Sequence, residues 1–300
     1  MTQQLVRPAR RARPEMSEKQ LAFWMLLPAA LLLLAVVVYP VGRLIWTSFF
    51  DYSNGPVNPP YIGLGNYSKA LSDSDVWQAL KVTGLYIVIT VPGGMLFGLL
   101  LALLANLPFK VRWPVRLSLL LPWSMSMAFA SLIFAWFFNS DYGVVNDVLK
   151  RVGLNAPNWL SSPNLAIVAT SITIIWKTSS FVALILLAGL QTIPNEMYEA
   201  ADVDGAGAWT KFWRLTLPLL TPSLIVAAIF RTITAIQTFD VPYIMTNGGP
   251  GRITTTVAMM IQQQTLQFGN FGYGAAIAVL LFLLSLVITG FYLRHIGGER

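Results

Sequence analysis

Residues 21–42 read LAFWMLLPAALLLLAVVVYPVG, and no charged side chain interrupts them. A helix that crosses the roughly 30 Å hydrocarbon core of a membrane needs about 20 mostly apolar residues. The rest of the chain has the same character, because 55% of its 300 residues are hydrophobic and only 11% are charged, whereas roughly a quarter of the residues in soluble domains are charged. The sequence therefore predicts an integral membrane protein.

Six apolar segments are long enough to cross a membrane as helices. They are Leu21–Phe50, Val76–Leu104, Val115–Phe138, Leu165–Leu190, Pro218–Met245 and Phe271–Arg294. Membrane-spanning strands would alternate apolar and polar residues, but these segments are continuously apolar, so we expect an all-α, polytopic fold with about six transmembrane helices. The first segment could instead be a cleaved signal peptide, but its apolar run continues past Tyr39 without a small-residue cleavage site.

Basic residues predict which loops face the cytoplasm, because loops on that side are enriched in Lys and Arg. Twelve fall at the termini or in the even-numbered loops: Arg7, Arg10, Arg11, Arg13, Lys19, Lys110, Arg112, Arg116, Lys211, Arg214, Arg294 and Arg300. The other side holds six: Arg43, Lys69, Lys81, Lys150, Arg151 and Arg252. We therefore expect a multi-pass protein with both termini in the cytoplasm.

The longest predicted cytoplasmic connection covers residues 191–218 and has the signals of a short helix followed by a turn. Pro194 suits the first helical position, where its missing N–H has no partner in any case. Glu199 favours the positive end of that helix. Gly205 or Gly207 can end it in a left-handed conformation.

A second short helix is expected in this connection from about Trp209 until Pro218 interrupts its hydrogen bonding. Its aromatic and basic side chains permit two interpretations. Either they seat an amphipathic helix at the membrane surface, or the loop is a docking knob that enters the groove of a cytoplasmic partner. The residues concerned are Trp209, Lys211, Phe212, Trp213 and Arg214.

The same connection carries a spaced motif. Glu199-Ala200-Ala201 is followed after three residues by Gly205, and after nine more by Leu215, with Leu217-Pro218 one residue later. This pattern resembles the EAA loop of permease subunits of binding-protein-dependent ABC importers. Leu215 is a mild departure, since isoleucine is usual there. Residues 238–250 (TFDVPYIMTNGGP) and 271–276 (FGYGAA) resemble the end of helix five and the start of helix six in the carbohydrate-uptake subfamily, which includes permeases of maltose, trehalose, lactose and glycerol-phosphate type.

The resemblance implies a type I ABC importer permease of a bacterial or archaeal inner membrane, which forms half of a sugar translocation pathway. In that family the loop forms a coupling helix that fits a cleft on the ATPase. The role is carried onto the residues that match the motif: Glu199, Ala200, Ala201, Asp202, Gly205, Leu217 and Pro218. The implied partners are a homologous second permease, two copies of a cytoplasmic ABC ATPase, an extracytoplasmic solute-binding protein, a sugar and membrane lipid, but no nucleic acid.

ATP hydrolysis is expected in the partner rather than in this chain. No phosphate-binding loop of the Gly-x-x-x-x-Gly-Lys-Ser/Thr type and no Gly-Lys dipeptide occurs. No catalytic constellation is evident around the single histidine, His295. We therefore expect no enzymatic activity and no cofactor in this chain, with ATP and magnesium bound by the separate ATPase.

The predicted organisation has four parts. Residues 1–20 form a cytoplasmic basic arm, and residues 21–75 form the first transmembrane helix with a short outer loop. Residues 76–294 form the transmembrane permease domain, which includes the coupling loop 191–218. Residues 295–300 form a cytoplasmic tail.

Polar side chains inside the predicted spans are the candidates for a solute pathway, because charged residues within a membrane usually face a cavity or a partner. The candidates are Trp176, Lys177, Ser180, Arg231, Thr234, Gln237, Thr238, Asp240 and Tyr243. Thr234 and Thr238 should share one helix face with Arg231, whereas Gln237 and Asp240 share another. Structural ion pairs or subunit contacts are the alternative interpretation.

Lys177 and Arg231 have the same charge, so each needs an acidic or carbonyl partner elsewhere. An ion-coupled secondary transporter that uses Asp240, Lys177 or Arg231 is the rival function, and a channel or a membrane-bound enzyme fits the sequence less well. The glycines of the second span, Gly84, Gly93, Gly94 and Gly98, are interpreted as positions of close helix packing.

Overall fold

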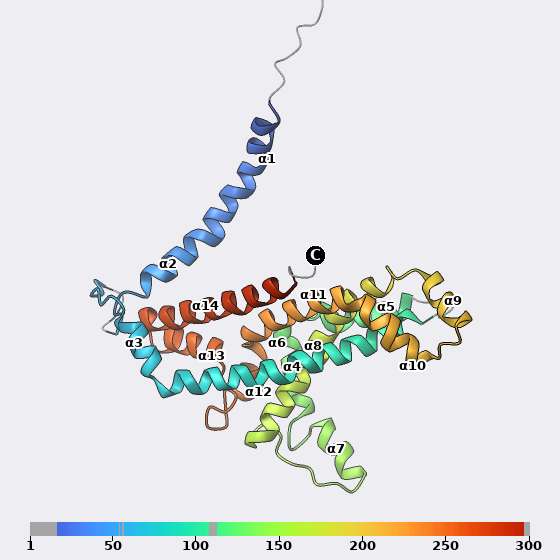
Figure 1. Ribbon diagram of the computed structural model, residues 1–300. Helices are drawn as coiled ribbons and strands as arrows, with labels where there is room; N and C mark the ends of the chain where they lie inside the picture. The colour runs from blue at the N-terminus through green and yellow to red at the C-terminus, as the bar shows by residue number, and fades with distance from the viewer. Residues whose placement is uncertain (1–16, 54, 56, 108–112, 297–300) are drawn as a thin grey trace, which may run out of the picture. The chain divides into compact units, whose positions relative to one another are not determined.

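The computed structural model describes residues 17–53, 55, 57–107 and 113–296 (Figure 1). Within these residues every regular element is helical, and the only strand-type pairing is an isolated bridge between Phe50 and Tyr61. The all-α prediction is therefore confirmed. Several basic residues of the topology prediction lie outside the described residues: Arg7, Arg10, Arg11, Arg13, Lys110, Arg112 and Arg300. The side chains of Arg116 and His295 are likewise outside the described set.

The chain divides into two compact units, and the first ends at Thr47. Its described part is one helix made of α1 (Glu18–Leu33), the π-helical η1 (Leu34–Val38) and α2 (Tyr39–Thr47). Ser17 and Gln20 start this helix with a capping box, in which each side chain accepts a hydrogen bond from the backbone N–H of the other. The predicted first span is thus a helix with a defined beginning.

The second unit runs from Ser48, so the segment from Ser48 to Asp73 groups with the remaining helices rather than with the first span. Its helices are α3 (Gly65–Ser72), α4 (Ser74–Asn106), α5 (Trp113–Ser124), α6 (Met127–Phe137), α7 (Val144–Arg151), α8 (Pro163–Leu190), α9 (Asn195–Val203), α10 (Ala208–Lys211), η2 (Phe212–Thr216), α11 (Leu217–Ile236), α12 (Asp240–Thr246), α13 (Val257–Gln262), η3 (Gln263–Gln267) and α14 (Phe271–Ile296). Figure 1 shows α3 and α13 at one end of this unit and α9 and α10 at the other.

Helix α4 is the element that the second unit packs around. Buried residues of α4 belong to all three hydrophobic clusters of the unit. Ala102 packs with α5, α8 and α11, Tyr86 packs with α8 and α12, and Ala79 packs with α3, α13 and α14. The Tyr86 hydroxyl is also 2.8 Å from Thr170 Oγ1 of α8, so the buried ring is held by a polar contact as well.

Glycines of α4 permit its close approach to α8, as predicted for this helix. A Cβ at Gly98 would lie 2.4 Å from Val182 Cγ1 and 3.0 Å from the Ser179 carbonyl oxygen, and one at Gly93 would lie 2.5 Å from Ile175 Cδ1. Small residues at such positions let helix backbones approach within a membrane. Gly84 differs, because a Cβ there would meet nothing within 4 Å, so this glycine does not serve close packing between helices of this chain.

Five helices of the described chain are long and apolar enough to cross a membrane, and a sixth span exists if the bent pair of residues 117–124 and 127–137 counts as one. The pair bends by 95°, so the single helix predicted over Val115–Phe138 is two helices. Pro122 lies in the last turn of α5. The hydroxyl of Ser126 caps α6 by accepting a hydrogen bond from Phe129 N at 3.1 Å.

The predicted helix Pro218–Met245 is also broken, because α11 ends at Ile236 and α12 begins at Asp240. By contrast, Pro218 does not interrupt the helix before it, and that expectation is wrong. Residues 208–236 form one continuous helix, in which the π-helical η2 ends two residues before the proline. A wider π turn relieves the clash between a proline ring and the carbonyl four residues earlier. The same order occurs at η1 and Pro40.

We predict that Gly98→Ala destabilises the protein by about 1–3 kcal/mol, because the added methyl group overpacks the contact with Val182, which is fully buried. Gly84→Ala is the matched control: it faces open space, and it should match or exceed the wild type because alanine favours a helix by about 1 kcal/mol over glycine. Thermal unfolding of the two variants in detergent measures the difference. Equal midpoints would contradict the close α4–α8 packing.

Candidate functional site

Helices α9 and α10 form a compact knob, here defined as residues 194–211, at one end of the second unit. Pro194 was predicted as the first helical residue, but it is the N-cap of α9, and the helix begins one residue later at Asn195. Gly205 has φ +72°, which confirms it as the residue that ends the helix. Two backbone hydrogen bonds close the turn, from Gly205 N to Asp202 O at 3.0 Å and from Ala206 N to Ala201 O at 2.9 Å. This pair is the Schellman arrangement of a helix C-terminus.

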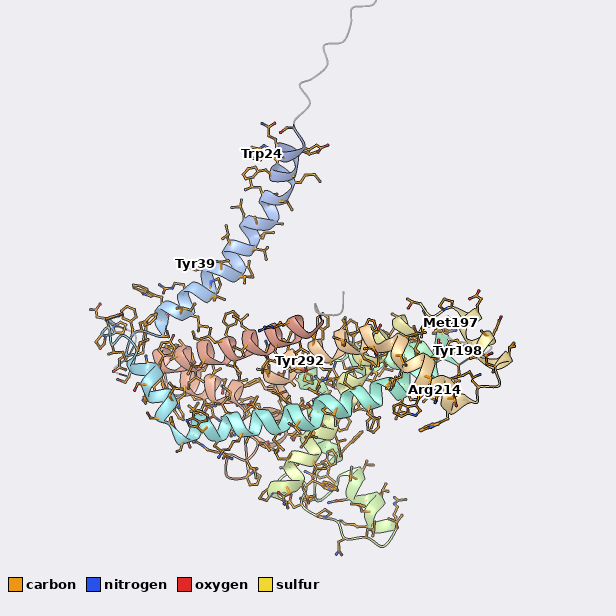
Figure 2. The ribbon with its side chains drawn as sticks, in the orientation of Figure 1. Trp24, Tyr39, Met197, Tyr198, Arg214 and Tyr292 are labelled. Carbon is orange, nitrogen blue, oxygen red and sulfur yellow. The ribbon has the colours of Figure 1, made fainter. Side chains whose placement is uncertain are left out.

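Two side-chain contacts fasten α9 onto the helix that follows the turn. Lys211 Nζ donates to Asp202 Oδ1 at 2.6 Å, and the Tyr198 hydroxyl is 3.1 Å from Thr216 Oγ1 of η2. Tyr198 also packs against the hydrophobic cluster that contains Leu220 of α11. Figure 2 shows Met197, Tyr198 and Arg214 together at this end of the unit. The knob is therefore attached to the start of the long helix 208–236.

The remaining surface of the knob is exposed. Glu199 and Ala200 are exposed on α9, and the side chain of Val203 has 89% of its surface accessible. Trp209 of α10 is 74% exposed. Of the residues matched to the EAA motif, Asp202 is engaged by Lys211, and Leu217 and Pro218 begin α11. Apolar side chains displayed on a short helix beside a carboxylate form the kind of surface that enters a partner's groove.

A second feature, here called the polar cavity, lies where both broken helices of the unit come together. Its volume is about 160 Å³. Its lining combines residues of the α11–α12 break with residues of α6, α8 and α11: Met127, Ile174, Thr178, Arg231, Thr234, Gln237, Thr238, Phe239, Asp240 and Val241. Irregular backbone inside a membrane is tolerated where it is buried in protein or lines a cavity. Discontinuous helices form the solute sites of many transporters.

Five of the nine residues predicted for a solute pathway line this cavity. Arg231, Thr234 and Thr238 were expected on one helix face and Gln237 and Asp240 on another. That division is wrong, because the helix ends at Ile236 and the break turns the later residues to the same cavity as the earlier ones.

Arg231 is held by neutral oxygen atoms. Its Nη1 donates to Thr234 Oγ1 at 2.8 Å, and its Nη2 donates to Thr90 Oγ1 at 3.1 Å and to the Thr90 carbonyl at 3.3 Å. Gly94 lies one turn beyond Thr90 on α4, and a Cβ there would be 3.2 Å from Arg231 Nε. The predicted need for a carbonyl or acidic partner is thus met by a carbonyl, and Gly94 provides room for the guanidinium.

Lys177 supports the other break rather than the cavity. Its Nζ donates to the Trp123 carbonyl at 3.0 Å, in the last turn of α5, where the helix leaves carbonyls without an intrahelical partner. The side chain is 8% exposed and does not line the polar cavity. The predicted carbonyl partner is confirmed, and this buried cation satisfies a backbone group at the bend.

The other three pathway candidates lie elsewhere. Trp176 and Ser180 line a larger apolar cavity of about 450 Å³ between α4, α5 and α8. The ring of Tyr243 stacks on Phe239, with centroids 4.9 Å apart and planes at 19°. Phe239 itself lines the polar cavity, so Tyr243 forms part of its second layer.

The comparisons with known proteins identify the family. The sequence profile of the binding-protein-dependent transport system inner membrane components matches residues 94–296, which is more than half of the chain. The chain belongs to this family.

Similar proteins extend the match to more than nine-tenths of the chain. The sulfoquinovosyl glycerol transport system permease protein of Agrobacterium fabrum is 56% identical, over 94% of this chain and 92% of its own. The trehalose/maltose transport system permease protein of Thermococcus litoralis is 37% identical, over 92% of this chain and 94% of its own. A crystal structure of a bacterial ABC transporter involved in the import of the acidic polysaccharide alginate contains a chain with 25% identity and a TM-score of 0.81, which covers 92% of this chain and 94% of that one.

Membership of the binding-protein-dependent transport family decides between the rival functions. The chain is a multi-pass inner-membrane component of a transport system that works with a solute-binding protein. This confirms the resemblance found in the EAA motif and the expectation of a transport subunit rather than an enzyme. The rival function, an ion-coupled secondary transporter, receives no support from the comparisons.

Several residues of the polar cavity and its support were missed in the sequence. Thr90, Trp123, Thr178 and Phe239 contribute a contact or a lining surface. The sequence signal for Thr90 was its spacing from Gly94. The two residues lie four apart on one helix face, so a hydroxyl lies beside a position without a side chain, where another group can fit.

We predict that Gly205→Ala loosens the knob, because alanine in the left-handed conformation costs about 1–2 kcal/mol. Gly207→Ala is the matched control: both glycines have open space where a Cβ would be, but the φ of Gly207 is −66°. Amide hydrogen exchange in α9 should be at least about fivefold faster in Gly205→Ala and unchanged in Gly207→Ala. The same exchange rate in both variants would show that the turn conformation does not limit the stability of the knob.

Proposed function

We propose that the chain is the permease subunit of an ATP-driven sugar importer and forms half of its translocation pathway. The solutes named for its relatives are sulfoquinovosyl glycerol, trehalose or maltose, and alginate. These solutes differ in size and charge, but all are carbohydrates. The partners in this proposal are a homologous second permease, two copies of a cytoplasmic ABC ATPase and an extracytoplasmic solute-binding protein. ATP and magnesium belong to the ATPase.

The knob is proposed as the coupling element that enters a cleft of the ATPase. The observation that carries this is the continuous helix 208–236, which begins in the knob and ends beside the polar cavity. The knob is fastened to the start of this helix by the contacts of Asp202 and Tyr198, and Arg231 lies near its other end. The helix would therefore transmit the closing movement of the two ATPase subunits from the knob to the cavity. In this way a docked segment can favour one of two packing arrangements of the membrane helices.

Within the knob, each residue of the motif has a distinct role in this proposal. Glu199 offers a carboxylate to the ATPase, and Ala200 and Ala201 allow close approach of the partner surface. Asp202 and Gly205 hold the knob in shape through the ion pair with Lys211 and the left-handed turn. Leu217 and Pro218 connect the knob to α11.

The proposed orientation places both termini and the knob in the cytoplasm. Six spans return the chain to the side on which it began, and the excess of Lys and Arg lies on the side of the termini. The knob lies at the end of the second unit opposite to α3 and α13 (Figure 1), which agrees with a cytoplasmic knob and extracytoplasmic connections around residues 48–73 and 247–270.

We predict that Glu199→Lys abolishes ATP-dependent uptake, because a lysine would replace the carboxylate offered to the ATPase. Glu196→Lys is the matched control: it makes the same charge reversal on the same exposed helix, outside the motif, and should retain most of the uptake. Uptake by vesicles that hold the complete transporter, and co-purification of the ATPase with the permease, measure the effect. Normal uptake and normal co-purification of Glu199→Lys would refute the coupling role.

A further inference from the structure

The charged side chains within the broken spans do not neutralise one another. Among the described residues there are three ion pairs, and all involve side chains near helix ends or loops: Arg151 with Asp147, Lys211 with Asp202, and Arg252 with Asp75. Lys177, Arg231 and Asp240 belong to none of them. Arg231 and Asp240 line the polar cavity, whereas Lys177 binds the backbone at the bend between α5 and α6. An uncompensated charge within a membrane is costly.

Arg231 has donors to spare. The side chain is 2% exposed, yet its three hydrogen bonds go to the two neutral threonines and use at most three of its five N–H donors. Its Nε has no hydrogen-bond partner among the described residues. A buried polar group without a partner is unfavourable unless something else binds it. Arg231 is one of the residues that line the polar cavity, and a ligand bound there would lie beside it.

Three more polar side chains of the cavity have hydrogen-bonding groups available to a ligand. Gln237, Thr238 and Asp240 line it, and within the described part of the chain their side chains take part in none of the hydrogen bonds that hold the fold. Asp240 forms no ion pair with Arg231, since its carboxylate oxygens lie farther than 4.0 Å from the guanidinium nitrogens. A carboxylate that accepts and an amide that both donates and accepts are suited to sugar hydroxyls.

We propose that the polar cavity binds the acidic group of an anionic glycoside, a carboxylate or a sulfonate, through Arg231. This deepens the proposed function, on which it rests. An oxyanion supplies the ion pair that Arg231 lacks among the described residues, which neither a neutral nor a cationic sugar does. A guanidinium binds planar or tetrahedral oxyanions through two parallel hydrogen bonds. Gln237 and Asp240 then bind hydroxyl groups of the same sugar ring.

The size of the cavity limits what enters it. At about 160 Å³ it is smaller than the roughly 300–1,000 Å³ of pockets that enclose a whole drug-sized ligand. It therefore takes the acidic end of the solute, while the remainder extends toward the rest of the pathway. The stacked rings of Phe239 and Tyr243 form an apolar wall against which the carbon face of that sugar ring can lie.

The test uses the complete transporter in liposomes with its binding protein and ATP. Three probes differ at one carbon of the sugar: methyl glucoside, methyl glucuronide, and the methyl glucoside that carries a sulfonate on its sixth carbon. We expect uptake of at least one charged probe to exceed uptake of the neutral probe by about tenfold or more, because hydrogen bonds to a charged group are stronger than those between neutral groups. Arg231→Gln should bring that ratio close to one, and Arg231→Lys should retain most of it.

Lys177→Gln is the matched control, because it removes the other buried cation, which does not line the cavity. It should lower total uptake through the weakened α5–α6 bend without changing the ratio of charged to neutral probe. Since all variants share one binding protein, a change in the ratio reports on the permease alone. If Arg231→Gln fails to assemble, Gln237→Leu provides a second test, because Gln237 lines the cavity and binds ring hydroxyls that the three probes share. It should lower uptake of all three probes by about the same factor, and a Gln237→Leu variant with unchanged uptake of every probe would refute binding of the solute in this cavity.

Two results would overturn the proposal. One is a wild-type transporter that assembles and hydrolyses ATP but takes up the neutral probe at least as fast as both charged probes. A working transporter that takes up no charged probe counts in the same way. The other is an Arg231→Gln variant that lowers uptake of all probes equally and leaves the ratio of charged to neutral probe unchanged. That result is expected if Arg231 only supports the helices. Failure of the chain to assemble with an ATPase and to support any ATP-dependent uptake would instead refute the proposed function.

Discussion

A membrane offers no water to hydrogen-bond an open backbone, and this constraint governs the whole architecture. Long helices satisfy their own amide groups, so α4, α8 and α14 run for 26 to 33 residues with few interruptions. Where the chain does break, other groups complete its hydrogen bonds. The amine of Lys177 binds the carbonyl left by the end of α5, and the hydroxyl of Thr256 donates to the Thr238 carbonyl in the α11–α12 break at 2.7 Å. The breaks are therefore stable features of the fold, and they bring polar side chains to one place.

The sequence predicted the spans because apolar length is a local property. Each predicted span corresponds to helix in the structure, and the turn at Gly205 was predicted because glycine is suited to the left-handed conformation. The interruptions were harder to foresee. Pro218 is the usual signal of a helix end, but a π turn placed before it keeps the helix continuous. The break after Ile236 has no proline or glycine at its centre, so local propensity could not reveal it.

The site was predicted in part for the same reason. Arg231, Asp240 and their polar neighbours could be selected because charge within an apolar span is rare, but their grouping depends on a break that redirects them to one cavity. Lys177 was selected on the same ground, and only the bend between α5 and α6 shows that it binds backbone instead. Thr90 and Trp123 could not be selected by residue type, because both act through backbone carbonyl oxygens, to which Thr90 adds its hydroxyl. Such contacts follow from tertiary packing.

The helix 208–236 has a consequence for how far a movement travels. From Ala208 to Arg231 it spans roughly 35 Å at 1.5 Å per residue. A tilt of about 10° at its knob end would displace the arginine by roughly 6 Å at that length, more than the diameter of a water molecule. In the coupling that we propose, this helix is a lever arm, and its length would turn a small rotation of the ATPase into a larger displacement beside the polar cavity.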